Sequence, residues 1–272
     1  MDLPAGFVEV TRGDAVVVAQ AGLLETLLAA GIEDPAGLTQ RVPGPHRGRG
    51  NLGRLDLEAG AFVVRPLVRG GLFGKLVRRT SFDRWRARAE LQTSVEAAAR
   101  GAPVLEVAAA VTRAHGVGWS HALVTREVAQ ARDLMTILRE GSGPPRAAAL
   151  AAAGRAVRLA HEAGIDHVDL NLKNVLITAA GEALVIDLDR CRLAAGPLSP
   201  AARERSLLRL LRSWRKLGAA APEAVRAADP LRFVRAYAAG DPELRRRLIG
   251  AGRRARFWTH RLRWRLFPPS SP

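Results

Sequence analysis

The sequence predicts an α+β fold with two unlike lobes, the first an antiparallel sheet with one main helix and the second mostly helical. Two observations support this prediction. Short apolar runs separated by Gly, Pro and polar residues dominate the first half of the chain, whereas longer Ala- and Leu-rich stretches dominate the second half. With 272 residues, 48% of them hydrophobic, the chain is long enough to bury a core and is unlike a disordered segment.

The first lobe is expected to comprise residues 1–126. Apolar runs bounded by turn residues predict strands at 15–19, 55–57, 61–67, 104–112 and 122–128, and a short helix at 22–30. Residues 85–100 have the composition of a helix, which Gly101 and Pro103 end. The stretch 42–53 is rich in Gly, Pro and Arg, so it is expected to be a loop.

The second lobe is expected to comprise residues 127–272. The Ala-rich stretch 146–163 predicts a helix that ends near Gly164, and apolar runs at 175–177 and 183–186 predict a hairpin around Gly181. After Pro200 the chain is expected to be helical. The residues that fall on one face there at helical spacing are Leu207, Leu208, Leu211 and Trp214.

The sequence also excludes several classes of protein. Cys191 is the single cysteine, so an intrachain disulfide is impossible and a reducing compartment is expected. The first residues lack a basic stretch followed by an apolar one, and the chain has no run of about 18 apolar residues. We therefore expect neither a signal peptide nor a membrane-spanning helix.

Positive charge is concentrated at the end of the chain. The formal net charge is +16, which favours an anionic partner such as nucleic acid, an acidic membrane surface or a phosphorylated substrate. Eighteen basic and five acidic residues lie in 201–272, whereas 1–200 is close to balanced. The excess charge therefore belongs to a basic helical tail at about 201–272.

A polar constellation follows the predicted 146–163 helix. Asp169 and Asn174 lie five residues apart in a loop, and Asp187 follows the second strand of the predicted hairpin. Phosphoryl transfer needs a carboxylate to take the acceptor's proton, and Mg²⁺ prefers oxygen ligands and bridges phosphates. The spacing thus predicts Asp169 as a base and Asn174 and Asp187 as magnesium ligands. The alternative is that Asp169 and Asn174 are turn residues and Asp187 a cap.

These motifs resemble those of known kinases. Residues 167–174 (HVDLNLKN) and 186–189 (IDLD) resemble the catalytic loop and metal-binding motif of the protein-kinase-like fold. The patterns at 169–176 (DLNLKNVL) and 186–192 (IDLDRCR), with RGGL at 69–72 and KL at 75–76, are more closely similar to bacterial lipopolysaccharide kinases of the 3-deoxy-D-manno-octulosonic acid (Kdo) kinase branch. The resemblance implies a bilobal, ATP- and Mg²⁺-dependent kinase that phosphorylates a hydroxyl, O4, of Kdo on a lipid A precursor.

The resemblance also assigns a phosphate-binding loop to the first lobe. Gly48, Gly50 and Gly53 form a Gly-x-Gly-x-x-Gly pattern, in which backbone N–H groups can approach phosphates without a Cβ clash. The alternative for this stretch is a flexible surface loop. Arg65 stands where the third strand should carry a phosphate-clamping lysine, and Lys75 is a rival for that role.

Two glutamates complete the expected nucleotide site. Glu90, on the 85–100 helix, is expected to brace the clamping cation, with Glu96 as its competitor and a solvated helix face as the alternative. Glu127 lies in the expected hinge, where backbone groups would meet adenine.

Three features argue against a protein substrate. Position 168 is Val rather than the Arg that reads a phosphorylated activation loop, and only 12 residues separate Asp187 from Pro200. Asn171 replaces the lysine usual in protein Ser/Thr kinases and fits a sugar kinase. Arg190 and Arg192 could instead meet an anionic acceptor such as the Kdo carboxylate, or form ordinary ion pairs. His167 is expected to brace the loop.

The basic tail offers three interpretations. Residues 244–267 interleave Arg with Trp, Phe and Leu, which suits an interfacial helix on anionic lipid, a nucleic-acid surface, or a helix packed on the lobe. Together with a kinase-like site, the tail favours a peripheral position on the cytoplasmic face of the inner membrane, with Kdo-lipid A as partner and without nucleic acid. The competing functions are a heptose or other small-molecule kinase, a Ser/Thr protein kinase, and a pseudokinase or nucleic-acid-binding module.

Overall fold

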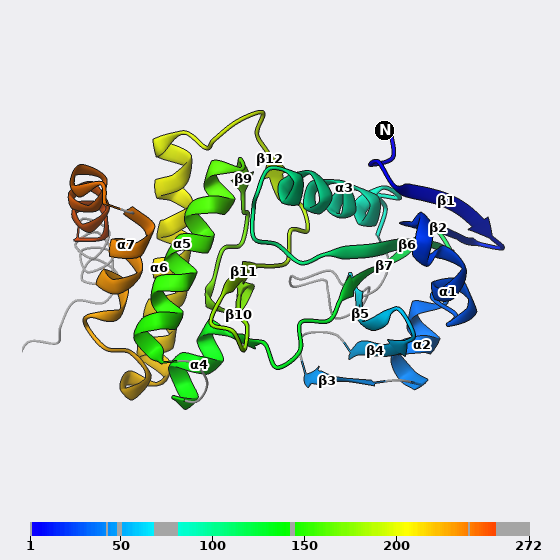
Figure 1. Cartoon of the computed structure of the whole chain (residues 1–272), viewed down its shortest axis with the longest axis horizontal. Coiled ribbons are helices and arrows are strands. Elements are labelled where there is room, and N and C mark those ends of the chain that lie inside the picture. Colours follow the sequence, from blue (N-terminus) through cyan, green and yellow to red (C-terminus); the bar gives the residue numbers. More distant parts are fainter. Residues whose placement is uncertain are drawn as a thin grey trace, which may run out of the picture. The chain divides into compact units, whose positions relative to one another are not determined.

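The structure is a computed structural model that describes residues 2–41, 43–47, 51–67, 81–141, 145–238 and 240–253, without the side chains of 41–51. It divides into two compact units, which we describe separately (Figure 1). Unit 1 comprises Met1–Arg100, Val104–Val128 and Asp187–Cys191, and unit 2 comprises Gly101–Pro103, Ala129–Ile186 and Arg192–Pro272. The expected mixed class with an antiparallel sheet is confirmed.

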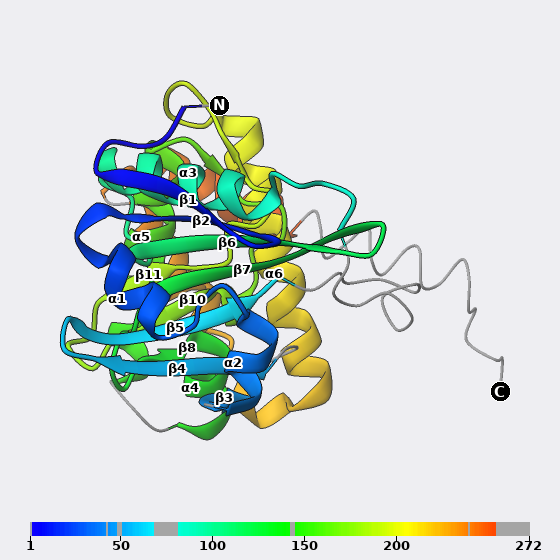
Figure 2. The ribbon, with the colours of Figure 1, turned by 90° about the vertical axis from the view of Figure 1, so that its right-hand side faces the viewer.

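Unit 1 is built on a seven-stranded sheet (Figure 2). The strands are β1 (Phe7–Arg12), β2 (Ala15–Gln20), β3 (Pro43–Arg47), β4 (Asn51–Leu57), β5 (Gly60–Pro66), β6 (Val107–His115) and β7 (Gly118–Arg126). Their order is β1-β2-β6-β7-β5-β4-β3, and every neighbouring pair is antiparallel. The strand β1 is absent from the sequence prediction, because Glu9, Thr11 and Arg12 interrupt its apolar residues, whereas β2 begins with an unbroken apolar run.

The two faces of this sheet carry different helices. The turn η1 (Ala21–Leu23) and the helices α1 (Leu24–Ala29) and α2 (Pro35–Arg41) contribute to one apolar cluster, and α3 (Arg86–Ala99) contributes to the other. Since successive strand residues point to opposite faces, Phe62 and Val64 of β5 lie in the first cluster. Arg65 consequently lies on the face that α3 covers.

The loop expected at 42–53 is wrong in part. Within it the structure has β3 and the start of β4, paired at Pro43 with Gly53 and at Arg47 with Asn51. Gly and Pro are poor strand formers in a sheet interior, but β3 is the last strand of the sheet, where proline is tolerated because one of the strand's two hydrogen-bonding sides has no neighbouring strand. Of the predicted glycine pattern, Gly53 lies on β4, whereas Gly48 and Gly50 lie outside the described residues.

Unit 2 combines helices with two small sheets (Figure 1). Its strands are β8 (Arg132–Asp133), β9 (Ile165–Asp166), β10 (Val175–Ile177), β11 (Ala183–Val185) and β12 (Arg192–Leu193). Its helical elements are α4 (Leu134–Glu140), α5 (Arg146–Glu162), η3 (Leu172–Asn174), α6 (Pro200–Ala220), η4 (Pro222–Ala224), α7 (Asp229–Ala238) and a stretch at 242–253. The predicted 146–163 helix and the hairpin around Gly181 are confirmed as α5 and as β10 with β11.

Helix α5 approaches α7 closely at a glycine. A Cβ placed on Gly154 would lie 2.5 Å from the backbone O of Phe233 and 3.0 Å from the Cβ of Ala236. Because the obstacle is backbone, it has little freedom to move aside.

We expect Gly154→Ala to lower the free energy of unfolding by about 1–3 kcal/mol through overpacking, although alanine is the better helix former. Gly218→Ala on α6 is the matched control, because its new Cβ would meet nothing closer than 3.7 Å. The control should be neutral or stabilised by up to about 1 kcal/mol. Urea unfolding of both variants measures this, and equal midpoints would show that the α5–α7 contact relaxes freely.

The apolar face expected on α6 is only partly right. Trp214 is buried, but Leu207, Leu208 and Leu211 are half-buried. The buried positions of this helix are Ala202, Ser206, Leu210, Ser213, Trp214 and Leu217. Hydrophobic periodicity misplaces the face because two buried positions are serines, whose hydroxyl groups are satisfied by hydrogen bonds.

Those bonds belong to a polar core in unit 2. The hydroxyl of Ser206 lies 3.0 Å from Nε2 of His161, and the hydroxyl of Tyr237 lies 2.8 Å from Nδ1 of the same ring. Burial lowers the pKa of His161 to about 3, so the imidazole is neutral and can use both nitrogens in this way.

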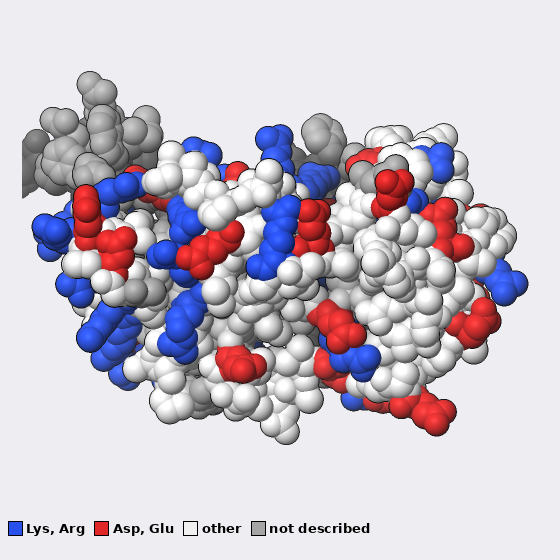
Figure 3. Space-filling view, turned by 45° about the horizontal axis from the view of Figure 1, so that its top comes forward, with Lys and Arg blue, Asp and Glu red and all other residues white. Residues whose placement is uncertain are grey.

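Charge is unevenly distributed over the two units. Figure 3 shows both signs over unit 1 and many Lys and Arg side chains over unit 2 on the face that it draws. Thirteen of the residues between 201 and 253 are Lys or Arg. Within the described part of the chain, no helix is long and apolar enough to cross a membrane.

Candidate active site

The predicted catalytic loop connects β9 to η3 in unit 2. The side chain of Asp169 is exposed, and its Oδ2 accepts a hydrogen bond of 3.2 Å from the amide of Asn171. The backbone O of Asp169 accepts two more, each 2.9 Å, from the amides of Asn171 and Asn174. The loop therefore fixes the backbone of Asp169 and one of its carboxylate oxygens while leaving the group in solvent.

Asn171 is also the residue that starts η3. Its Oδ1 accepts from the backbone N of Lys173 at 2.9 Å, as a helix N-cap does. The side chain of Asn171 thus makes three hydrogen bonds within the loop, two as donor to Asp169 and one as acceptor from Lys173. These bonds orient Asp169.

His167 braces the loop, as the sequence predicts for it. It is 2% exposed, its Nδ1 accepts from the backbone N of Asp169 at 3.2 Å, and its Nε2 lies 3.0 Å from the O of Ile186. A neutral ring protonated at Nε2 satisfies both contacts. Ile186 is the residue before Asp187, so His167 ties the two predicted motifs together through the backbone.

Two further bonds hold this arrangement. The backbone N of Ile186 donates to the O of Asn174 at 3.0 Å. The hydroxyl of Ser213, on α6, accepts from the backbone N of Leu172 at 3.2 Å in a buried contact. Nothing in the sequence assigns a role to Ser213, because 41 residues separate it from its partner and a lone serine in a helix carries no local signal.

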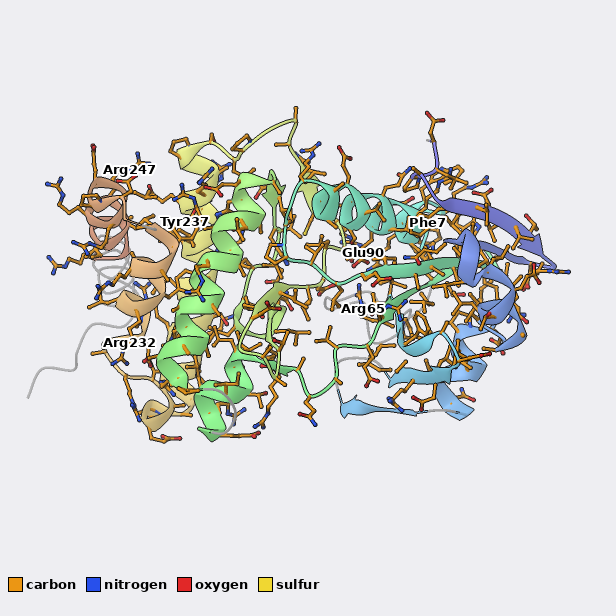
Figure 4. All side chains as sticks on the ribbon, in the orientation of Figure 1. Phe7, Arg65, Glu90, Arg232, Tyr237 and Arg247 are labelled. Atoms are coloured by element: carbon orange, nitrogen blue, oxygen red, sulfur yellow. The ribbon has the colours of Figure 1, made fainter. Side chains whose placement is uncertain are left out.

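In unit 1 an arginine joins the two predicted carboxylates. Arg65 of β5 forms an ion pair with Glu90 of α3 through Nη2 (Figure 4). Its Nη1 lies 3.0 Å from Oδ1 of Asp187. The Glu90 side chain is 2% exposed and that of Arg65 is 30% exposed. The structure thus brings Arg65 together with Glu90 rather than with Glu96, which pairs with Arg100 on the helix surface.

Burial dominates the electrostatics of this pair. Desolvation raises the pKa of Glu90 to about 7, although the neighbouring Arg65 acts in the opposite direction. The carboxylates of Glu90 and Asp187 outweigh the desolvation of Arg65 and raise its pKa, so the guanidinium stays charged.

We expect the stability of the protein to depend on pH through Glu90. Because its pKa is higher in the folded than in the unfolded chain, the folded state holds the proton more tightly, and this group lowers the free energy of unfolding as the pH rises from about 4.5 to about 7. Glu90→Gln lacks this contribution. The difference between its Tm and that of wild type should therefore shift in favour of the variant as the pH rises from about 4.5 to about 7. Thermal unfolding across the interval measures the difference, and parallel curves would contradict the expectation.

The remaining predicted nucleotide residues are placed as follows. Glu127 accepts from Nε of Arg54 at 2.8 Å, and its backbone N donates to Ala61 at 2.9 Å. Both contacts lie within unit 1, and the adenine contact of this segment stays a prediction. Lys75 lies outside the described residues.

The two arginines predicted to meet the acceptor are both exposed. Arg190 has 62% of its side chain in solvent and lies 3.9 Å from Asp189. Arg192 opens the short strand β12, which pairs with β9. Neither is locked into a buried ion pair, so each is available to an anion.

Comparison with known proteins identifies the family. A family model described as "Lipopolysaccharide kinase (Kdo/WaaP) family" matches residues 36–237. The chain belongs to this family. The lipopolysaccharide kinase resemblance predicted from the sequence is therefore confirmed, and as a kinase of this family the protein is a phosphotransferase that uses ATP and an alcohol group as acceptor.

Individual relatives of this lipopolysaccharide kinase agree with the family assignment. A 3-deoxy-D-manno-octulosonic acid kinase of Stenotrophomonas maltophilia is 35% identical over 198 residues, 70% of this chain and 76% of the relative. One of Vibrio cholerae serotype O1 is 32% identical over 180 residues, 65% and 74% of the two chains. A solved structure titled "WaaP in complex with acyl carrier protein" aligns with a TM-score of 0.53 and 20% identity over 88% of this chain and 98% of that chain, which shows the fold.

Proposed function

We propose that the protein transfers the γ-phosphate of ATP to O4 of Kdo on a lipid A precursor, in the synthesis of the lipopolysaccharide core. The observation that carries this proposal is the loop at 167–174, which holds Asp169 by its backbone and by Asn171 while leaving the carboxylate exposed. Asp169 then acts as the base that takes the proton of the acceptor hydroxyl. The curated relatives named as Kdo kinases support the choice of acceptor.

The donor groups fit magnesium. Asn174 is 8% exposed and its Nδ2 donates to the backbone O of Asp169, so Oδ1 is the atom that would serve as a ligand. Asp187 gives one carboxylate oxygen to Arg65 and keeps the other. Amide and carboxylate oxygens are ligands that Mg²⁺ prefers, and the ion would neutralise charge on the transferred phosphate.

Arg65 takes the role of the phosphate-clamping lysine. Its guanidinium is held by the buried Glu90, keeps its charge, and offers a planar fork to phosphate oxygens. The glycine pattern at 48–53 and Lys75 are assigned to the same phosphates, and Glu127 to the adenine segment, on the family resemblance. This places nucleotide binding in a first lobe at 1–126 and catalysis in a second at 127–272.

The acceptor carries negative charge, and the protein has exposed arginines that can bind it. The exposed Arg190 and Arg192 can pair with the Kdo carboxylate, and Asn171 stands beside the catalytic aspartate. The basic tail would place the protein on an anionic membrane surface at the cytoplasmic face of the inner membrane. Residues 254–272 of that tail lie outside the described residues.

Labelled ATP and a panel of acceptors test this function. The purified protein should transfer label to Kdo-lipid A precursor in the presence of Mg²⁺, and not to a heptose-bearing core glycolipid, to a general protein substrate or to a small sugar. Transfer to the heptose acceptor alone would reassign the substrate within the family. Absence of any transfer, with DNA binding that falls steeply as salt rises, would favour a nucleic-acid-binding module.

A further inference from the structure

A second carboxylate after β11 is tied to α3. Asp189 lies two residues beyond Asp187, and its Oδ1 and Oδ2 accept from Nε and Nη2 of Arg86 at 2.9 and 2.6 Å. Two parallel bonds of this kind fix the carboxylate in orientation as well as in position. The same guanidinium also donates to the backbone O of Leu67 at 3.4 Å, which anchors it next to the end of β5.

This ion pair is largely removed from water. The Arg86 side chain is 7% exposed and that of Asp189 is 18% exposed. Burial would raise the pKa of Asp189, but the bonds and charge of Arg86 lower it below its usual value, so the pair stays ionised. A pair with these partners holds its geometry far better than an exposed ion pair does.

The segment that the pair anchors has an unusual backbone. Asp187 and Arg190 both have positive φ, 64° and 59°, a conformation that residues other than glycine rarely adopt. Such residues persist where their surroundings hold them. The surroundings here are the ion pair at Asp189, the buried side chain of Leu188, and a hydrogen bond of 2.9 Å from the N of Cys191 to the O of Leu188.

Helix α3 thus reaches both acidic residues of the segment. Arg86 and Glu90 are four residues apart, on one face of the helix. Arg86 binds Asp189 directly, whereas Glu90 binds Arg65, which binds Asp187. The sequence pattern includes Asp189 in a family motif but gives it no role, because its partner lies 103 residues earlier in the chain.

We propose that Asp189 is a positioning residue for phosphoryl transfer, and that its buried bidentate ion pair with Arg86 holds the strained segment so that the free oxygen of Asp187 is aimed at the magnesium ion. This role rests on the proposed function, because the orientation of Asp187 matters to the rate only if Asp187 binds the metal. Asp189 itself touches neither nucleotide nor acceptor in this scheme.

The test compares Asp189→Asn with wild type for the Mg²⁺ concentration that gives half-maximal rate, for kcat and for Tm. We expect the half-saturating Mg²⁺ concentration to rise, or kcat to fall, by about 10–100-fold at temperatures where the variant is folded, as when other residues that orient metal ligands are changed. Glu106→Gln is the control, because it removes an exposed ion pair of 3.0 Å with Arg126 in the same unit. The control should match wild type.

A second variant keeps the proposal testable if Asp189→Asn fails to fold. Asp189→Asn leaves Arg86 buried without its carboxylate, so the double variant Arg86→Met with Asp189→Leu replaces both charges by apolar groups. If this variant keeps the Tm of wild type, its Mg²⁺ requirement should still be raised about 10-fold or more. A wild-type Mg²⁺ curve and kcat in either folded variant overturns the positioning role and reduces the pair to a structural tether.

A measurement of nucleotide binding distinguishes failure of the proposed function from failure of the positioning role alone. Titration of wild type with a non-hydrolysable ATP analogue and Mg²⁺ should show metal-dependent binding, weakened in Asp189→Asn. If wild type binds no Mg²⁺–nucleotide, the proposed function and the positioning role fall together. If wild type binds it and Asp189→Asn binds it equally well, with an unchanged kcat, only the positioning role falls.

Discussion

Asp169→Asn is expected to lower the rate of phosphate transfer by about 10²–10⁴-fold, because an amide cannot accept the proton of the acceptor hydroxyl. The change is nearly isosteric, and the backbone bonds from Asn171 and Asn174 to position 169 do not depend on the carboxylate. Folding and nucleotide binding should therefore be retained. Transfer of labelled phosphate, with Tm and nucleotide affinity measured on the same preparation, checks both parts.

The control for this substitution is Asp14→Asn. Asp14 is an exposed aspartate of unit 1 paired with Arg113 at 2.8 Å, away from the predicted loop in the sequence. Its variant should keep the rate of wild type within a factor of about two, since exposed ion pairs contribute little. If the Asp169→Asn protein is folded and transfers phosphate at a rate within about tenfold of wild type, another group acts as the base.

Arg146→Ala is expected to destabilise unit 2 by about 3–5 kcal/mol, because it leaves a buried carboxylate without its cation. Asp229 is fully buried, and its carboxylate accepts from Nε of Arg146 at 3.1 Å and from Nη2 of the same residue at 2.5 Å. Arg146 also donates to the backbone O of Leu138 and of Ala224, so the loss reaches α4 and η4 as well.

The matched control is Arg232→Ala, which acts on the same carboxylate from the solvent side. Arg232 lies 3.6 Å from Asp229 with 44% of its side chain exposed, and its loss should cost less than about 1 kcal/mol. The double variant Arg146→Leu with Asp229→Leu removes both buried charges and should regain much of the stability. Urea unfolding ranks the variants, and equal losses for Arg146→Ala and Arg232→Ala would contradict the assignment.

The contacts between Arg146 and Asp229 also determine how the stability of the protein changes with pH. Burial would raise the pKa of Asp229, but the bonds from Arg146 lower it below 3.8, so the wild type keeps this stabilisation above that pH and loses it as the pH falls further. Without Arg146 the buried carboxyl should take up a proton at mildly acidic pH. The gap in stability between wild type and Arg146→Ala should consequently narrow on acidification.

The parts of the fold that the sequence predicts correctly are those with local signals. The apolar run of β5, the composition of α3 and the Ala-rich run of α5 all depend on neighbouring residues, and the structure has these elements at the expected places. The strand β3 was expected to be loop, because Pro and Gly indicate a turn unless the strand is known to lie at a sheet edge. Edge position is a property of the whole sheet.

The candidate site likewise has residues that local sequence patterns predict and supporting contacts that they do not. The spacing of Asp169, Asn174 and Asp187 is local and recognisable, so their roles can be predicted from the sequence. The contacts that hold them are distant in sequence. Ser213 meets Leu172 across 41 residues and Arg86 meets Asp189 across 103, and a single sequence carries no sign of either pairing.

The serines of α6 determine which way this helix faces. Ser206 serves the imidazole of His161 and Ser213 serves the backbone of the loop at 167–174, two partners on different elements. A turn of the helix by one residue, about 100°, would remove both hydroxyl groups and bring arginines such as Arg205 and Arg212 towards the interior. The slipped helix would leave Nε2 of His161 and the backbone N–H of Leu172 without these partners, so the two serines favour one rotational setting of α6. In that setting Ser213 holds the start of η3, within the loop that bears Asp169.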